Sequence, residues 1–339
     1  MESNGELVKF LGEGAYGAVH LVRYILSDGS FYHVAVKGSS PTNRDSLNRE
    51  LKILRELRGC PRIVTCFGDS LEEGLGYDRR KVYNLILEYA PEGSLSDFMD
   101  GYIDRKLPEP LIKDFTRMIL EGLVSIHGHG YVHCDIKPDN LLVFPSGGDD
   151  DDSYELKISD FGVTLEVGDT PDYWSIYSPF VGSPRYMPPE SVENGVVKET
   201  LDLWSLGCLV LEMYTGERPW EGADNDRIEA LLLGGKAPEI PESVPCDARE
   251  FIQTCFARNP EERGSAFKLW FHRFLLLRPR EEDKVVAVVA AAGEKRDSLP
   301  LRIRGAWKDI TKKPLKAKIF PSKPQKFKKI LNSLLGCLG

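Results

Sequence analysis

The sequence predicts an α+β fold with two lobes: a small β-rich N-terminal lobe that contains one helix, and a larger, mainly α-helical C-terminal lobe. Two observations lead to this prediction. Up to residue 90 the chain has short runs rich in Val, Tyr, Leu and Ile, separated by turns of Gly, Asp and Ser, as strands do. Beyond Gly93 apolar residues recur at intervals of three and four over long stretches, as they do in helices.

The first lobe should contain one helix among its strands. Within residues 45–57, four leucines lie at intervals of three and four, and Arg and Glu occupy the other faces. This stripe predicts an amphipathic helix. The strands are expected at residues 8–11, 19–24, 32–37 and 82–88.

The helical pattern also sets the limits of the second lobe. We expect the first lobe at residues 1–90, the second at 91–277 and a tail at 278–339. Gly and Asp dominate residues 146–152, which predicts a flexible acidic insertion between two short strands. Helices are expected at residues 110–129, 200–215, 225–234, 247–258 and 265–277.

The composition is that of an ordinary globular protein, with 42% hydrophobic and 28% charged residues over 339 positions. The seven cysteines are scattered without a CxxC pair, so neither a disulfide framework nor a zinc site is expected. The N-terminus is polar and acidic, unlike a targeting peptide. The longest apolar run, 285–292, is far shorter than the roughly 20 residues of a transmembrane helix. We therefore expect no transmembrane segment, and a location in the cytoplasm, the nucleus or both.

Charge is distributed unevenly along the chain. Residues 301–330 hold eleven Lys and Arg against one acid, so this window carries +10 and the remainder of the −8 chain carries −18. A strongly acidic body repels polyanions. We therefore expect no nucleic-acid partner, and only the tail has the charge to attract an anionic surface.

Three glycines near the N-terminus, Gly12, Gly14 and Gly17, precede Val19 in the pattern GxGxxGxV. Without side chains, such residues let backbone N–H groups approach a phosphate closely. A dinucleotide-binding fold would need a helix directly after the glycines, whereas residues 19–24 have the pattern of a strand. The context favours a β-hairpin lid over a nucleotide, although the glycine spacing alone would favour an ordinary glycine-rich hairpin.

A lysine on a predicted strand and then a glutamate on a predicted helix follow this loop. Lys37 ends the predicted strand Val-Ala-Val-Lys, and Glu50 lies on the predicted helix. A lysine that grips phosphates needs a carboxylate to fix its direction. Taken singly, each residue is more often a solvated surface charge. Their order after the glycines favours a phosphate-binding pair.

Residues 133–140, His-Cys-Asp-Ile-Lys-Pro-Asp-Asn, hold the catalytic candidates Asp135, Lys137 and Asn140. Phosphoryl transfer to a hydroxyl needs a carboxylate that orients and accepts the proton, cations that neutralise charge, and oxygen ligands for Mg²⁺. Asp160, followed by Phe and Gly, adds a second carboxylate. We expect Asp135 as the base, and Asn140 and Asp160 as the metal ligands.

These motifs, followed by Met187-Pro188-Pro189-Glu190, stand in the order typical of the protein kinase family, which the sequence resembles over residues 8–275. The resemblance implies the bilobal kinase fold, with ATP and Mg²⁺ as cofactors. Lys137 resembles the lysine of serine/threonine kinases, which implies transfer of the ATP γ-phosphate to Ser or Thr of a protein. A scaffold that binds nucleotide and partner kinases without catalysis is the alternative.

The resemblance implies further roles, residue by residue; for all but the ion pair, core packing is the alternative explanation. Glu190 and Arg263 match a buried ion pair that anchors the substrate-binding loop, Asp202 matches the brace of the catalytic loop, and Ser183 matches the hydroxyl that faces the catalytic aspartate. The positions that match those around adenine are the sandwiching Val19, Ala35 and Leu142, the gatekeeper Leu87, and the hinge residues Glu88 and Ala90.

The sequence departs from the family at Cys134, where most kinases have an arginine that receives the phosphate of a phosphorylated activation loop. A thiol cannot make bidentate phosphate contacts. We hypothesise that this kinase depends less on phosphorylation of residues 163–181, although Thr170, Ser175, Tyr177 and Ser178 are candidates. A small buried filler is favoured over a redox switch for Cys134.

Several segments, His-Cys-Asp among them, resemble a plant group of mitogen-activated protein kinase kinase kinases. This implies a MAP kinase kinase as the protein substrate, within a stress or hormone signalling cascade.

The tail ends in apolar residues at intervals of three and four over 326–338, with Lys, Asn and Ser largely between them. This predicts a short basic amphipathic helix. Contact with a partner kinase, binding to an anionic membrane, nuclear import and a frayed solvated end all remain open.

Overall fold

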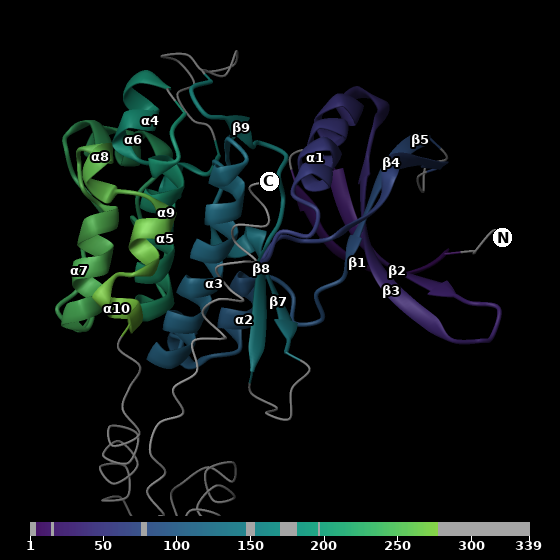
Figure 1. The fold of residues 1–339 in the computed structure, drawn as a ribbon, viewed down its shortest axis with the longest axis horizontal. Coiled ribbons are helices and arrows are strands. Elements are labelled where there is room, and N and C mark those ends of the chain that lie inside the picture. The colour runs from purple at the N-terminus through teal and green to yellow at the C-terminus, as the bar shows by residue number, and fades with distance from the viewer. Residues whose placement is uncertain are drawn as a thin grey trace, which may run out of the picture.

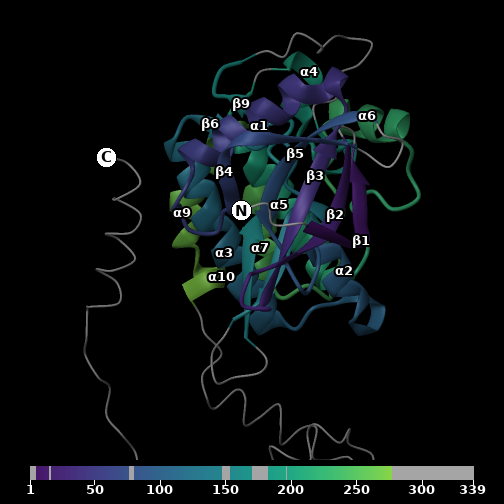
Figure 2. The same cartoon turned by 90° about the vertical axis from the view of Figure 1, so that its right-hand side faces the viewer.

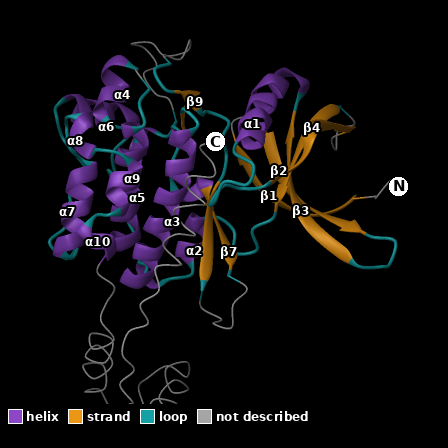
Figure 3. Cartoon of the chain, viewed as in Figure 1, coloured by secondary structure: helices purple, strands orange, loops and turns teal. Residues whose placement is uncertain are grey.

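The computed structural model separates strands and helices along the chain, and this confirms the predicted α+β fold class (Figures 1 and 3). The N-terminal part holds a five-stranded sheet and one long helix, and the C-terminal part is mainly helical. The structure describes residues 5–14, 17–75, 80–146, 153–169, 182–195 and 197–276.

All neighbouring strands of the N-terminal sheet are antiparallel, in the order β1-β2-β3-β5-β4 (Figure 2). The four predicted strands are present, each somewhat longer than expected. β4 was not predicted because it is a polar edge strand with Gly, Asp and Glu in its sequence, and its pairing with β5 is irregular between Phe67 and Glu72. The strands are β1 Gly5–Gly14, β2 Gly17–Ile25, β3 Phe31–Ser39, β4 Cys66–Leu75 and β5 Lys81–Glu88.

The helix of this part, α1, runs from Arg44 to Glu56 and packs on β4 and β5, in agreement with the leucine stripe. Leu47, Leu51 and Leu54 are buried, as expected of the apolar face. Glu50 is buried on the same helix with only 2% of its surface exposed, which is unusual for a carboxylate and calls for a charged partner.

The C-terminal part is organised around two buried helices, α3 and α5. The helix predicted at 265–277 is instead two short helices, because the chain turns at Phe271 and His272 and the His272 ring accepts the Phe274 N–H at 3.2 Å. Residue 277 lies outside the described residues. The helices are α2 Leu95–Asp100, α3 Glu109–Gly128, α4 Pro189–Asn194, α5 Thr200–Thr215, α6 Asn225–Leu233, α7 Cys246–Cys255, α8 Pro260–Arg263, α9 Ala266–Trp270 and α10 Arg273–Leu276.

Two small antiparallel pairs lie between the sheet and the helices. β6 Tyr131–Val132 pairs with β9 Leu165–Glu166, and β7 Leu141–Pro145 pairs with β8 Tyr154–Ile158. They bring the candidate catalytic loop, which follows β6, next to the Asp-Phe-Gly segment, which precedes β9. Most of the predicted acidic insertion between β7 and β8 lies outside the described residues.

Within the described ranges, no helix is both long and apolar enough to cross a membrane. The apolar run at 285–292 and the predicted amphipathic helix at 326–338 lie outside those ranges.

Candidate active site

The glycines lie on the β1–β2 hairpin, where Gly14 pairs with Gly17, and residues 15–16 between them lie outside the described residues. Gly17 has a φ of 152°, and a Cβ there would lie 1.9 Å from the carbonyl oxygen of Gly38. Only glycine therefore fits this close approach of β2 to β3. Directly after the glycines the chain continues as a strand, so the hairpin has the shape expected of a lid.

Lys37, at the end of β3, joins the two parts of the molecule. Its Nζ lies 2.7 Å from Glu50 Oε2 and 2.8 Å from Asp160 Oδ1. Burial opposes the positive charge, but the two carboxylates outweigh it and raise the pKa of Lys37, while Lys37 holds the pKa of Asp160 below its usual value despite burial. The site therefore presents a fixed cation beneath the glycine hairpin.

The catalytic loop brings Asp135, Lys137 and Asn140 together. Lys137 Nζ lies 2.8 Å from Asp135 Oδ2 and 2.7 Å from Ser183 Oγ. The Asn140 amide nitrogen donates to the carbonyl oxygen and to Oδ2 of Asp135, at 2.8 and 2.9 Å. Among the residues that the structure describes, the buried Asp135 Oδ1 has no hydrogen-bond partner. This oxygen remains available to accept a proton from a hydroxyl.

Asp202, on α5, accepts hydrogen bonds from the backbone of this loop. Its Oδ2 accepts the N–H of His133 at 2.9 Å and lies 2.8 Å from His127 Nε2, while Oδ1 accepts the N–H of Cys134 at 3.0 Å. Asp202 is fully buried, and Cys134 has a φ of 67°. A non-glycine residue in this left-handed conformation is strained, so the Asp202 contacts maintain the shape of the loop.

Cys134 lies among apolar side chains rather than in an open anion site. It is 2% exposed and clusters with Val132, Leu165, Val197 and Leu201. Its thiol donates to the Val132 carbonyl oxygen at 3.4 Å, and burial raises the pKa of the thiol well above its usual value. This environment is that of a buried filler, which is inert toward oxidation. The phosphorylation candidates between residues 170 and 178 lie outside the described part of the chain.

Asp160 and Asn140 supply only oxygen ligands, and this fits a hard divalent cation. Because the Asn140 nitrogen faces Asp135, its Oδ1 is left for a metal. Among the described residues there is no cluster of three or more His, Cys, Asp or Glu side chains suited to a metal ion. A site with so few protein ligands suits an ion that takes its remaining ligands from phosphates and water, as Mg²⁺ does.

The positions expected around adenine lie on β2, β3, β5 and β7 and directly after β5. Ala35 pairs with Leu87 across β3 and β5, and Leu142 on β7 forms an isolated bridge with Ser94. Val19 pairs with Lys37 on the neighbouring strands. The buried Ala90 follows β5, where the chain leaves the sheet.

Glu88 makes side-chain contacts that the sequence did not predict. Its carboxylate lies 2.7 Å from Lys157 Nζ on β8 and accepts the Thr65 N–H at 2.6 Å. Contacts over separations of 69 and 23 residues leave no periodic signal in a sequence. The contact with Lys157 ties the end of β5 to the C-terminal part, and the contact with Thr65 ties it to the segment before β4.

The expected ion pair of Glu190 and Arg263 is present and deeply buried. Two Arg263 nitrogens lie 2.5 and 2.9 Å from the Glu190 oxygens, and Arg263 is fully buried. The guanidinium also donates to the carbonyl oxygens of Thr200 and Ala257, each at 3.0 Å. The segment that begins with Ser183 and carries Glu190 is thereby anchored to the helical core.

Two site residues escaped the sequence analysis, His133 and Phe161. The buried His133 ring lies 3.0 Å from the Ser159 carbonyl oxygen and makes an edge contact with the Phe161 ring, with centroids 5.0 Å apart. Phe161 is fully buried and directly follows Asp160. Their positions beside Asp135 and Asp160 in the two motifs were the available signal. Their contacts join the segment of Asp135 to the segment of Asp160.

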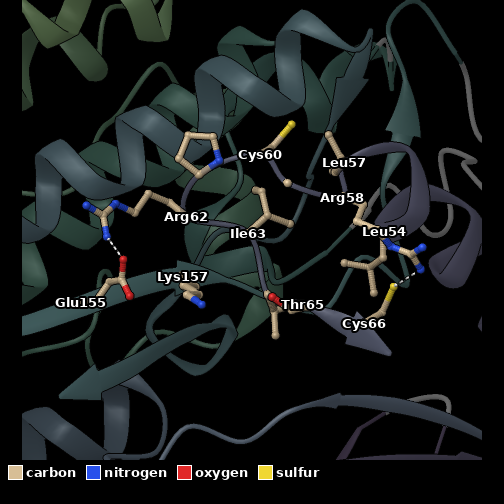
Figure 4. Close-up of a pocket in the computed structure, with 13 residues that line it drawn as sticks. Leu54, Leu57, Arg58, Cys60, Arg62, Ile63, Thr65, Cys66, Glu155 and Lys157 are labelled. Carbon is tan, nitrogen blue, oxygen red and sulfur yellow. Dashed lines mark hydrogen bonds and ion pairs between the residues drawn. The ribbon is translucent and has the colours of Figure 1, made fainter. Parts of the chain in front are cut away.

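A cavity of about 200 Å³ lies apart from this site, where the segment after α1 meets β8. It is lined by the end of α1, by residues 58–66 and by Glu155 and Lys157 (Figure 4). Arg62 pairs with Glu155 here, and with Glu121 on α3 at 2.9 Å. No candidate catalytic or ATP-binding residue lines this cavity.

Comparison with known proteins identifies the family of the chain. The model of the protein kinase domain matches residues 6–275. Mitogen-activated protein kinase kinase kinase 20 of Arabidopsis thaliana is 31% identical over 84% of this chain and 82% of its own length. Mitogen-activated protein kinase kinase kinase 3 of Arabidopsis thaliana is 36% identical over 79% of this chain and 42% of its own length. Mitogen-activated protein kinase kinase 1c of Physcomitrium patens is 33% identical over 82% of this chain and 78% of its own length.

Proposed function

The chain belongs to the protein kinase family, and from this premise we propose that it acts as a mitogen-activated protein kinase kinase kinase that phosphorylates Ser or Thr of a MAP kinase kinase. As a family member it is an ATP-dependent protein kinase that works with a divalent metal ion. Its place in the cascade is supported by the names of the two Arabidopsis relatives. The surroundings of Lys137 support Ser/Thr specificity.

The observation that carries the proposal is the pairing of Asp135 with Lys137. Oδ2 of Asp135 is held by Lys137 and Asn140, and Oδ1 has no partner among the described residues. We assign Oδ1 to the substrate hydroxyl, whose proton it orients and accepts as the phosphoryl group leaves ATP. Lys137, at 2.8 Å from the same carboxylate, neutralises charge that develops in the transition state.

Lys37 serves as the phosphate anchor in this proposal. Held by Glu50 from one side and Asp160 from the other, its ammonium group has a fixed direction before the nucleotide binds. The glycines of the β1–β2 hairpin offer backbone N–H groups to the same phosphates. Adenine would lie between Val19 and Ala35 on one side and Leu142 on the other.

We propose Mg²⁺ as the metal ion, held by the Asn140 amide oxygen and the Asp160 carboxylate. When bound, the ion neutralises charge on the phosphate oxygens. Asn140 and Asp160 would orient it relative to Asp135, because Asn140 contacts Asp135 directly. Measurement of activity with Mg²⁺, Mn²⁺ and Ca²⁺ after chelation should give the highest rate with Mg²⁺, and a higher rate with Ca²⁺ would contradict the assignment.

The proposal also covers the location of the protein in the cell, the signalling cascade in which it acts and the role of its basic tail. We place the protein in the cytoplasm, the nucleus or both, in a stress or hormone cascade, with the basic tail on a partner kinase or an anionic membrane. Deletion of residues 326–339 tests the tail, because an unchanged activity, location and partner recovery would leave it without a role. Fluorescence of a tagged full chain tests the location.

A phosphorylation assay tests the main proposal. The wild type, Lys37→Met and Asp135→Asn are incubated with radiolabelled ATP and a panel of kinase-inactive MAP kinase kinases and MAP kinases. We expect labelling of a MAP kinase kinase by the wild type, and losses of about two to four orders of magnitude in the variants. Lys52→Met on the exposed side of α1 is the matched control and should retain activity.

Each other outcome has a distinct meaning. Labelling of MAP kinases alone would move the protein one step down the cascade, as the name of the Physcomitrium relative suggests for that protein. Equal labelling by the wild type and both variants would refute catalysis by this site and favour the scaffold alternative.

A further inference from the structure

The ion pair of Lys37 and Glu50 depends on the position of α1. Lys37 is fixed in the sheet by β2 and β5, whereas Glu50 is carried by the helix. A shift of α1 by a fraction of a helical turn would move the Glu50 carboxylate out of its 2.7 Å contact. Whatever holds α1 against the C-terminal part therefore also controls the direction of Lys37.

One tie between α1 and the C-terminal part is made by Arg49, the residue next to Glu50. Its Nη2 donates to the carbonyl oxygen of Thr164 at 3.0 Å. Thr164 is fully buried, two residues after the Asp-Phe-Gly motif, and its hydroxyl lies 3.4 Å from the His133 carbonyl oxygen. Arg49 thus connects α1 to a segment that is itself bonded to the catalytic loop.

A second tie is made near the end of the helix. The Tyr131 hydroxyl donates to Glu56 Oε2 at 2.6 Å, and Tyr131 is 6% exposed. Tyr131 begins β6, which pairs with β9 and directly precedes the candidate catalytic loop. Arg49 and Glu56 are seven residues apart, which is about two helical turns, and they therefore lie on the same side of α1. In Figure 1 α1 lies near β9.

Among the residues that the structure describes, the surroundings of these ties do not form an anion site. Cys134 and Leu165 lie in an apolar cluster beside β6 and β9, and Arg49 bonds a neutral carbonyl group rather than a carboxylate. Both ties therefore form between unmodified residues of the chain. A phosphorylated residue is not needed to complete them.

We propose that Arg49 and Tyr131 are positioning residues that together hold α1, and with it Glu50, in place for phosphoryl transfer. This inference rests on the proposed kinase function. The position of α1 would then be controlled by two hydrogen bonds between unmodified residues: Arg49 with the Thr164 carbonyl oxygen, and Tyr131 with the Glu56 carboxylate.

The test uses the full chain, treated with phosphatase, four single variants of the ties and their control, and Glu50→Gln with and without Arg49→Ala. Arg49→Ala and Tyr131→Phe remove one tie each, and Arg49→Lys keeps a positively charged hydrogen-bond donor. Arg55→Ala is the matched control, because Arg55 is an arginine on the same helix that faces Asp69 on β4 at 3.6 Å. For each protein we would measure kcat, the KM values for ATP and substrate, amide hydrogen exchange of α1, and the thermal midpoint of unfolding.

We expect Arg49→Ala to lower kcat about 5- to 10-fold, which corresponds to the loss of one charge-assisted hydrogen bond, with little change in the KM of the protein substrate. Tyr131→Phe should lower kcat about 3-fold. Both should accelerate exchange within residues 44–56, and Arg49→Lys should recover part of the loss. In a Glu50→Gln background Arg49→Ala should cost nothing further, because the ion pair it protects is already gone.

Two results would overturn the proposal. One is an Arg49→Ala protein whose kcat and hydrogen exchange in α1 equal those of the wild type. The other is a loss of kcat on Arg49→Ala that is as large in the Glu50→Gln background as in the wild type. A general drop in the unfolding midpoint without faster exchange in α1 would also contradict it. If the wild type labelled no substrate, the proposed function would fail on its own, whereas hydrogen exchange would still test whether Arg49 and Tyr131 hold α1.

Discussion

Lys137 donates to Ser183 Oγ at 2.7 Å, and this contact joins the catalytic loop to the first residues of the segment 182–195. The same ammonium group holds Asp135 at 2.8 Å. Gly182 reinforces the junction, because its φ of 93° and the Cys134 carbonyl oxygen, which would lie 2.2 Å from a Cβ, exclude other residues. The position of the segment 182–195 is therefore coupled to the position of the Asp135 carboxylate, which we propose as the catalytic base.

Replacement of Ser183 should uncouple the segment 182–195 from Asp135. Ser183→Ala removes one acceptor of Lys137, and we expect kcat to fall about 5- to 30-fold, because a charge-assisted hydrogen bond contributes about 1–2 kcal/mol. Ser183→Thr keeps the hydroxyl and should retain most of the activity. Steady-state kinetics with a protein substrate would measure both, and a Ser183→Ala enzyme as fast as the wild type would refute the coupling.

Replacement of Asp202 should destabilise the whole domain. In Asp202→Asn one carboxylate oxygen becomes an NH₂ group that faces a backbone N–H donor, so a buried group of Asp202, His133 or Cys134 loses its partner. We expect a loss of about 2–3 kcal/mol in the free energy of unfolding. Urea denaturation measures this loss, and Asp226→Asn on the exposed start of α6 should change it by less than about 0.5 kcal/mol.

The reactivity of the cysteines should follow their burial. Burial raises the pKa of the Cys134 thiol, so that at pH 8 it stays protonated as well as inaccessible, whereas Cys246 is exposed. We expect an alkylating reagent to modify Cys246 at least about 100-fold faster than Cys134 in the native protein. Peptide mapping after timed labelling would show this, and comparable rates would mean that the apolar cluster opens readily.

The apolar cluster around Cys134 also affects how the kinase activity should depend on phosphorylation. Since a thiol among apolar side chains cannot bind a phosphate group, we expect activity to survive phosphatase treatment to within about 2-fold. The measurement compares initial rates before and after treatment, with loss of phosphate verified by mass. A collapse of activity would contradict the hypothesis and place phosphate recognition elsewhere in the chain.

The parts of this molecule that were predictable from sequence are those where chemistry or burial demands a fixed spacing. The glycine hairpin and the pairing of Lys37 with Glu50 could be predicted because the motifs restrict residue type and order. The long helices α3 and α5 were predictable because their buried faces repeat along the chain. The fold class followed from the same two patterns.

The remaining features depend on contacts between distant residues. The contact of Arg49 with Thr164 spans 115 residues, and that of Glu88 with Lys157 spans 69, so neither leaves a local pattern. β4 escaped prediction because an edge strand tolerates Gly, Asp and Glu. The break between α9 and α10 depends on the His272 ring as an acceptor, which apolar periodicity does not report.

His272 should make stability depend on pH. Burial lowers its pKa below the usual 6.5; Arg273 adds to this effect, while Glu250 and Asp247 oppose it. Its ring accepts the Phe274 N–H at 3.2 Å and packs on Phe251 with centroids 5.3 Å apart. The neutral ring makes both contacts, and protonation would remove the acceptor.

The linkage between proton binding and folding sets the direction of this pH dependence. Because the folded-state pKa is lower, the unfolded chain binds the proton more readily, and the contribution of His272 is fully present above about pH 6.5 and lost as the pH falls through the folded-state value. We expect the free energy of unfolding to decrease between pH 7.5 and 5.5, and to decrease less in His272→Gln, which keeps an acceptor but does not titrate. Urea denaturation at both pH values measures this difference, and identical slopes in the two proteins would exclude His272 as the cause.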